Sequence, residues 1–162
     1  MYMKKIDIVV GKENLFYDEV GKRPIFVKFY MDGCLHCENM KPAWNELEND
    51  LINNYEGDFT IMAVNANALN QLKSPIIENV EGFPTIFMVN KDGSKGIDYN
   101  GDRSKTDMLN FVLSNSNVKK SRLPTPYPRR IKRQKIKKSK SKKLNKSKKV
   151  KKYNRRTRRY RG

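Results

Sequence analysis

The chain has 162 residues, about the size of one domain, and its 35 Lys and Arg against 17 Asp and Glu give a formal net charge of +18. The excess lies in residues 119–162, which hold 23 Lys and Arg and no acid, whereas residues 1–118 hold 12 basic and 17 acidic side chains, a net charge of −5. Residues 119–162 have too little apolar surface to offset chain entropy, so we expect them to be disordered. We find neither an apolar run long enough to span a membrane nor a secretory signal, so we expect neither a membrane span nor export.

The first elements alternate between strand and helix. Alternating apolar residues predict a strand at residues 6–10, and the spacing at 13–20 predicts a short helix that ends at Gly21. Residues 24–30 (PIFVKFY) are almost entirely β-branched and aromatic, which favours a strand buried on both faces at the centre of a sheet.

A long helix is predicted from Cys34 to Tyr55, because large apolar residues recur there every three or four positions and Gly57 follows as a stop signal. Pro42 lies inside this helix, where it removes one backbone hydrogen bond and crowds the preceding turn. We therefore expect a kink near residues 40–42.

The rest of residues 1–118 continues the alternation. In chain order we expect a buried strand at 59–64, a short helix within 65–80, strands at 85–89 and 96–99 joined by a tight turn, and an amphipathic helix at 107–118. This order is typical of an α/β fold with a hairpin at one edge of its sheet.

Alternate prolines in residues 123–128 (LPTPYP) hold the chain extended and prevent both helix and sheet. We therefore predict one folded domain at 1–118, a Pro-rich linker at 119–128 and a disordered Lys/Arg-rich tail at 129–162.

Cys34 and Cys37 are the only two cysteines, three positions apart where the predicted central strand runs into the long helix. Residues three apart on a helix share a face, so the pair can form a small disulfide, and Cys34 meets the free N–H groups and positive dipole of the first turn. Such an environment lowers a cysteine pKa from about 8.5 to roughly 3.5–7.5. His36 lies between them and would favour the thiolate further. The pattern predicts thiol–disulfide exchange in which Cys34 reacts first and Cys37 resolves the mixed disulfide.

Two other interpretations of the cysteine pair remain open. A zinc site needs four ligands, but every Cys and His of the chain lies within one tetrapeptide, so zinc is disfavoured. A purely structural or vestigial pair is the second alternative. We predict no metal and no cofactor apart from the redox-active disulfide of Cys34 and Cys37.

Three motifs resemble the thioredoxin superfamily, most closely the thioredoxin domains of protein disulfide isomerases. They are residues 26–42 (FVKFYMDGCLHCENMKP), with a proline five positions after the second cysteine, residues 80–88 (VEGFPTIFM) and residues 99–103 (YNGDR). Their order across residues 5–118 implies the thioredoxin fold, a central mixed sheet flanked by helices.

The resemblance also implies roles for single residues. Cys34 would be the nucleophile and Cys37 the resolving thiol. Pro84 would be a cis residue beside the disulfide, with the backbone of Phe83 presented to an extended substrate. The alternative for Pro84 is an ordinary turn proline.

Arg103 matches an arginine that helps to deprotonate the second cysteine in isomerase domains, although a solvated loop arginine is the equal alternative. Lys28 occupies the strand position where the family usually has a buried acid that relays a proton to the second cysteine. A charged lysine cannot do this, but desolvation can lower its pKa and a nearby cation favours thiolates. Gly33 stands where the family usually has tryptophan, which leaves a less apolar rim for substrates.

The basic tail is predicted to bind DNA, RNA or another polyanion, because it concentrates positive charge without any acid. The candidate residues are Arg129, Arg130, Lys132, Arg133, Arg155, Arg156, Arg158 and Arg159. Nuclear targeting alone, or a solvated tail without a specific role, are the alternatives.

Two functional hypotheses follow. The first is a thiol–disulfide oxidoreductase with protein thiols and disulfides as partners and a tail that binds a polyanion. The second is a nucleic-acid packaging or tethering protein whose folded domain is a structural head. We expect a monomer without membrane partners, located in the cytoplasm or nucleus. The Lys- and Asn-rich composition and the tail are similar to those of thioredoxin-like proteins of large DNA viruses, which makes the virion the alternative location.

Overall fold

The computed structural model describes residues 3–78 and 80–121, and the structural statements below concern this part of the chain. Its elements are β1 (Met3–Ile8), α1 (Asn14–Glu19), β2 (Ile25–Tyr30), α2 (Leu35–Asn54), β3 (Tyr55–Glu56), β4 (Phe59–Asn65), α3 (Ala66–Leu69), the 3-10 turn η1 (Pro75–Ile77), β5 (Thr85–Val89), β6 (Lys95–Asp98), α4 (Lys105–Ser114) and β7 (Lys119–Lys120). The α/β alternation predicted from the sequence is confirmed. The predicted linker from residue 122 onward and the predicted tail at 129–162 lie outside the described residues.

The main sheet has five strands in the order β1-β4-β2-β5-β6. β2 lies at its centre, parallel to β4 and antiparallel to β5, and five of its six residues are buried. The β5–β6 hairpin lies at one edge. The prediction of a buried central strand at 24–30 and of an edge hairpin is therefore correct.

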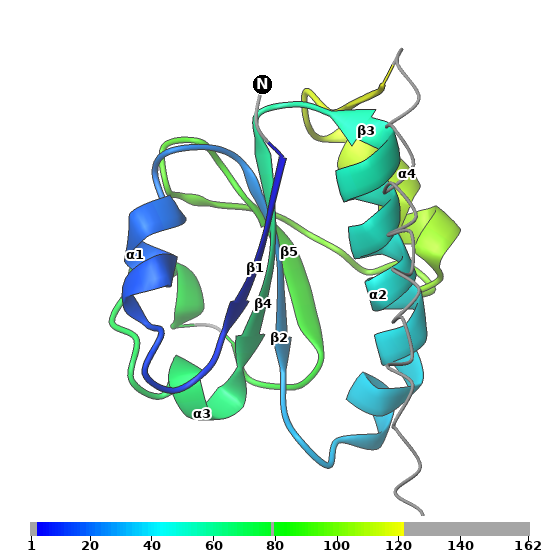
Figure 1. The fold of residues 1–162 in the computed structure, drawn as a ribbon. Helices are drawn as coiled ribbons and strands as arrows, with labels where there is room; N and C mark the ends of the chain where they lie inside the picture. The colour runs from blue at the N-terminus through cyan, green and yellow to red at the C-terminus, as the bar shows by residue number, and fades with distance from the viewer. Residues whose placement is uncertain (1–2, 79, 122–162) are drawn as a thin grey trace, which may run out of the picture. The chain divides into compact units, whose positions relative to one another are not determined.

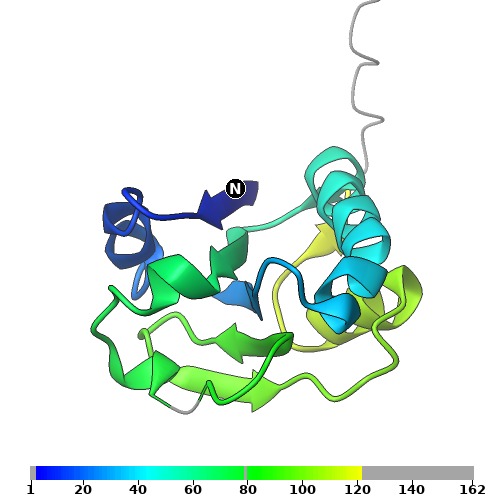
Figure 2. The ribbon, with the colours of Figure 1, turned by 90° about the horizontal axis from the view of Figure 1, so that it is seen from below.

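Helices cover both faces of this sheet. Figure 1 shows α1 and α3 on one side and α2 and α4 on the other, and the view from below in Figure 2 separates the same two pairs. Each side has its own apolar core: Trp44, Leu47 and Leu51 of α2 pack with Phe26 of β2 on one face, and Phe16 of α1 packs with Phe29 and the other inward side chains on the second. The alternating burial of β2 side chains on two opposite faces explains why its sequence is apolar or aromatic at every position except Lys28.

The first strand and the last helix differ most from their predicted bounds. The first strand starts at Met3 and ends at Ile8, because the chain turns after it: Lys12 N–H donates to the Val9 carbonyl, and Gly11 has φ +87°. Val10 is accordingly exposed rather than in the strand.

The last helix ends at Ser114 instead of residue 118. Beyond it the chain bends back, so that Val118 joins the core and β7 pairs antiparallel with β3. Lys119 and Lys120 therefore belong to the folded part, and the domain boundary predicted after residue 118 falls short of this strand.

α2 is continuous through Pro42, and the kink expected there stays a prediction. Among the residues that the structure describes, no helix is both long and apolar enough to cross a membrane.

Candidate redox site

Cys34 is the N-cap residue of α2, directly after the loop that leaves the central strand. Its sulfur accepts a hydrogen bond from the Cys37 backbone N–H at 3.3 Å, so it occupies the place where helix N–H groups lack intrahelical partners. Gly33, the residue before it, has φ +75°, a backbone conformation that glycine adopts at low cost. This explains physically why glycine, and not a large aromatic residue, precedes the first cysteine here.

The two thiols lie against each other with different surroundings. The Cys37 thiol donates to the Cys34 sulfur across 2.7 Å; Cys34 is half-buried and Cys37 is 6% exposed. The hydrogen bond from Cys37 lowers the pKa of Cys34, and the charge of Arg103 adds to this effect. Burial raises the pKa of Cys37, as does the hydrogen bond that it gives to Cys34. This asymmetry suits Cys34 to nucleophilic attack and Cys37 to the later step.

The Phe83–Pro84 peptide bond is cis and lies beside the thiols. The Cys34 thiol donates to the Phe83 carbonyl at 3.5 Å. Pro84 is buried, whereas Phe83 is half-buried. The structure thus brings Phe83 and Pro84 next to Cys34, although they are almost fifty residues away in sequence.

His36 and Arg103 both lower the pKa of Cys34. His36 is exposed on the first turn of α2, and its contribution to the lowered pKa of Cys34 comes from its backbone N–H. The positive charge of Arg103 also lowers the pKa of Cys34, and its expected action on Cys37 stays a prediction.

Lys28 is buried in the centre of the sheet, where its neighbours in register are Ala63 of β4 and Ile86 of β5. It lines a cavity of about 270 Å³ together with Cys37. Burial lowers the pKa of Lys28 to about 8, against the opposing attraction of Glu48 and Asp7. The lysine predicted to replace the family's buried acid therefore lies where it interacts electrostatically with the second cysteine.

Sequence reasoning missed several residues of this site. Glu48 is 3% exposed and lines the same cavity from α2, and only its place on the apolar face of a predicted helix could have singled it out. Met31 lies before the first cysteine and Leu35 lies between the two; they are 44% and 71% exposed. Two exposed apolar side chains therefore lie within three positions of Cys34 in the sequence, although the residue directly before it is glycine.

Within the described part of the chain, no group of three or more His, Cys, Asp or Glu side chains is arranged to hold a metal ion. The candidate nucleic-acid residues, Arg129, Arg130, Lys132, Arg133, Arg155, Arg156, Arg158 and Arg159, lie outside the described residues.

Comparison with known proteins gives concordant matches. The family model described as Thioredoxin matches residues 7–114. The chain is 31% identical over 100 residues to DnaJ homolog subfamily C member 10 of Rattus norvegicus, covering 62% of this chain and 12% of that protein. It thus spans about an eighth of the length of this curated relative.

Solved structures show the same fold. The J-Trx1 fragment of ERdj5 is similar with a TM-score of 0.53 and 27% identity, over 68% of this chain and 51% of that one. The first thioredoxin domain of mouse protein disulfide-isomerase A4 is similar in fold, with a TM-score of 0.54 and 24% identity, over 76% of this chain and 80% of that one.

Proposed function

This chain belongs to the thioredoxin family, whose model covers residues 7–114, and from that premise we propose that it is a thiol–disulfide oxidoreductase acting on protein substrates. One observation carries the proposal. A cysteine with a lowered pKa caps α2 and touches a second, buried cysteine with a raised pKa at 2.7 Å. A nucleophile and a resolving thiol of this kind are what disulfide exchange requires.

In the reducing direction, the Cys34 thiolate attacks one sulfur of a substrate disulfide. A Cys34–substrate disulfide forms, and the other substrate sulfur leaves with the electron pair and takes up a proton. Cys37 then loses its proton and attacks the Cys34 sulfur, which releases the second substrate thiolate. The substrate gains two electrons and two protons, and the enzyme is left with the Cys34–Cys37 disulfide. The reverse sequence oxidises a substrate dithiol.

Reduction of insulin by dithiothreitol, and refolding of a protein with scrambled disulfides, test this activity. The wild-type chain should accelerate both reactions, whereas the Cys34→Ser, Cys37→Ser double variant should not. The single Cys37→Ser variant should accumulate the Cys34 mixed disulfide, because the resolving step is removed. A wild-type chain no faster than the double variant would refute the proposal.

The direction of exchange in the cell depends on the reduction potential of the Cys34–Cys37 pair. A potential near about −270 mV would favour a reductase, and one well above about −200 mV an oxidase or isomerase. Equilibration with glutathione buffers measures this potential.

We also propose that residues 122–162 bind nucleic acid or another polyanion, because they hold 21 Lys and Arg and no acid. The full chain should retard duplex DNA with an affinity that falls steeply as salt rises, and a chain ending at Ser121 should not. A nucleic-acid tether with a structural head is the competing function: it predicts normal DNA binding with no disulfide exchange by the wild-type chain. DNA binding that survives removal of residues 122–162 would refute a role for the tail.

A further inference from the structure

The dipeptide of Asn100 and Gly101 is a reactive part of the motif at 99–103 that the two-cysteine mechanism does not use. Asn100 is the only asparagine of the chain that glycine follows. In such a dipeptide the main-chain nitrogen of the glycine can reach the side-chain amide carbon of the asparagine, because the glycine has no side chain that shields its nitrogen. The amide can then become an acid without any enzyme, so Asn100 is a candidate modification site.

The loop leaves both reacting groups accessible. Asn100 and Gly101 lie in the connection between β6 and α4, where both are exposed and line a shallow cavity of about 270 Å³. Among the described residues, no partner accepts a hydrogen bond from the Gly101 N–H, and the Asn100 side chain forms no hydrogen bond. Attack by the Gly101 nitrogen therefore requires no hydrogen bond to break first.

The contacts of the loop also require glycine at position 101. A Cβ there would lie 1.8 Å from Asp107 Oδ2 and 2.6 Å from the Tyr99 hydroxyl oxygen. These two oxygens are joined by a hydrogen bond of 2.6 Å, so neither can move aside without disturbing the other. A larger residue at position 101 is thus disfavoured, and the fold itself keeps the reactive dipeptide in place.

The loop is held at both of its ends. Tyr99 is 8% exposed, and its ring lies against Phe26 and Phe111 with centroid distances of 6.0 and 5.2 Å. At the other end, Ser104 is the N-cap residue of α4. Between these ends the Arg103 N–H donates to the Tyr99 hydroxyl at 3.0 Å. Because both ends are fixed, a longer main chain between them would displace this contact.

Arg103 connects the loop to the reactive thiol. The pKa of Cys34 is lowered mainly by the hydrogen bond from Cys37, and the positive charge of Arg103 adds to this effect. A carboxylate at position 100, three residues before Arg103, would offset part of this charge. Displacement of Arg103 would weaken its effect further. Both changes disfavour the Cys34 thiolate.

We propose that Asn100 is a deamidation site, and that water alone slowly converts this loop into a form with a less reactive Cys34. The Gly101 nitrogen attacks the Asn100 side-chain amide carbon, a C–N bond forms, and the bond from that carbon to Nδ2 breaks. Nδ2 leaves as ammonia after taking up the proton of the Gly101 N–H. Water then opens the cyclic imide at either carbonyl carbon, which gives aspartate or isoaspartate. Isoaspartate lengthens the main chain by one carbon, and no step transfers electrons between redox partners.

Ageing of the full chain tests the modification. The chain is incubated near neutral pH for increasing times and then digested with trypsin, which cuts after Lys95 and Arg103 and releases residues 96–103. Asn100 is the only amide side chain in this peptide, so the mass gain of an amide-to-acid conversion reports on it alone. Isoaspartyl methyltransferase with labelled S-adenosylmethionine identifies isoaspartate among the products. We expect the acid forms of this peptide to accumulate with time and to include isoaspartate.

Two controls separate this site from general ageing. Asn110 of α4 is exposed on the same shallow cavity but is followed by phenylalanine, so it should stay an amide. In Asn100→Gln the side chain would have to close a larger ring, and residues 96–103 should keep their mass. The wild-type chain in urea gives the rate without the fold. Loss of Asn100 in urea but not in the folded chain would overturn the proposal, as would equal loss of Asn110 and Asn100.

The rate of Cys34 alkylation by iodoacetamide tests the consequence for the thiol. The aged wild-type chain and a fresh Asn100→Asp variant should react about twofold or more slowly near neutral pH, because less of Cys34 is thiolate. Asn100→Gln should react like the fresh wild-type chain before and after ageing. Wild-type rates in both the aged chain and Asn100→Asp would overturn the effect on Cys34. Neither measurement depends on disulfide exchange with a protein, so failure here is distinct from failure of the proposed function.

Discussion

The backbone of Arg103 is hydrogen-bonded to a tyrosine hydroxyl. Its backbone lies in the left-handed region, with φ 64°, where a residue other than glycine is strained. The Tyr99 hydroxyl accepts from the Arg103 N–H at 3.0 Å and donates to Asp107 at 2.6 Å. Burial raises the pKa of Tyr99, so the hydroxyl stays a donor. Gly101 leaves room for this contact, since a Cβ there would lie 1.8 Å from Asp107 Oδ2.

Tyr99→Phe should therefore affect both stability and the reactive cysteine. We expect a loss of about 1 kcal/mol in the free energy of unfolding, because two partly buried hydrogen bonds lose their shared partner. We also expect a higher pKa for Cys34, since Arg103 is no longer held in place. The pH dependence of Cys34 alkylation by iodoacetamide measures this pKa. Tyr55→Phe, at the far end of the 20-residue α2, is the control and should leave the pKa of Cys34 unchanged. An unchanged alkylation profile in Tyr99→Phe would contradict the prediction that the Tyr99 hydroxyl positions the charge of Arg103.

At this scale the sequence reveals the residues that form a local motif. Cys34 and Cys37 could be predicted because a strand-to-helix junction defines their surroundings. Two other features could not be predicted, because they depend on contacts between residues that no local pattern links. They are the hydrogen bond from the Arg103 N–H to the Tyr99 hydroxyl and the place of Glu48 in the cavity that Lys28 lines.

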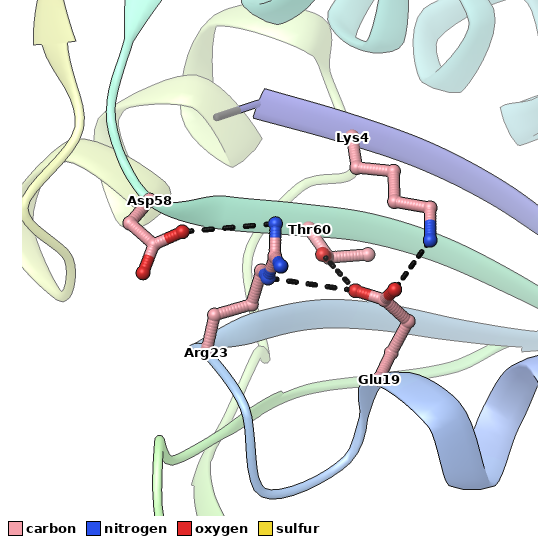
Figure 3. A network of polar contacts seen from close by, with 5 residues as sticks. All are labelled: Lys4, Glu19, Arg23, Asp58 and Thr60. Atoms are coloured by element: carbon pink, nitrogen blue, oxygen red, sulfur yellow. Dashed lines mark hydrogen bonds and ion pairs between the residues drawn. The ribbon is translucent and has the colours of Figure 1, made fainter. Parts of the chain in front are cut away.

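Among the elements, a buried carboxylate joins α1 to the sheet. Figure 3 shows the Glu19 carboxylate, which pairs with Lys4 of β1 and accepts a hydrogen bond from Thr60 of β4. Arg23 pairs with both Glu19 and Asp58. Burial alone would raise the pKa of Glu19, but the hydrogen bonds from Lys4 and Thr60 and the charges of Lys4 and Arg23 outweigh it, so the pKa is lowered from 4.5. Since Arg23 precedes β2 and Cys34 follows it, this cluster fixes the end of the strand away from the thiols.

This cluster predicts a specific loss of stability in acid. A carboxylate with a lowered pKa in the folded state stabilises fully above the unfolded value of 4.5, and this contribution is lost as pH falls through the folded pKa. Glu19→Gln should lower the free energy of unfolding by about 2 kcal/mol at neutral pH and by less in acid. Urea titrations between pH 7 and 3 measure the difference. Glu78→Gln, at an exposed position, is the control; a constant difference across this range would contradict the assignment.

The elements missed by sequence reasoning are those too short to carry a pattern. β3 and β7 have two residues each, and their pairing depends on the chain turning back after α4. The long helix and the central strand could be predicted because burial repeats along them many times.

For the whole molecule, the net charge of +18 hides two parts of opposite sign. Residues 1–118 carry −5, and the thiol site lies entirely within the described part of the chain. Thiol chemistry and polyanion binding should then be separable by shortening the chain, provided that the cut respects the fold.

The position of the cut decides the outcome. A chain ending at Ser121 keeps β7 and the hydrogen bond from the Ser121 N–H to the Asn54 carbonyl at 2.8 Å, so it should melt like the full chain and keep the insulin activity of the wild type. A chain ending at Val118 loses both and should melt lower by about 3–6 °C, as expected for a loss of about 1 kcal/mol. Thermal unfolding followed by circular dichroism compares the two. Equal melting would mean that β7 contributes nothing to the domain, and would restore the boundary after residue 118 that the sequence suggested.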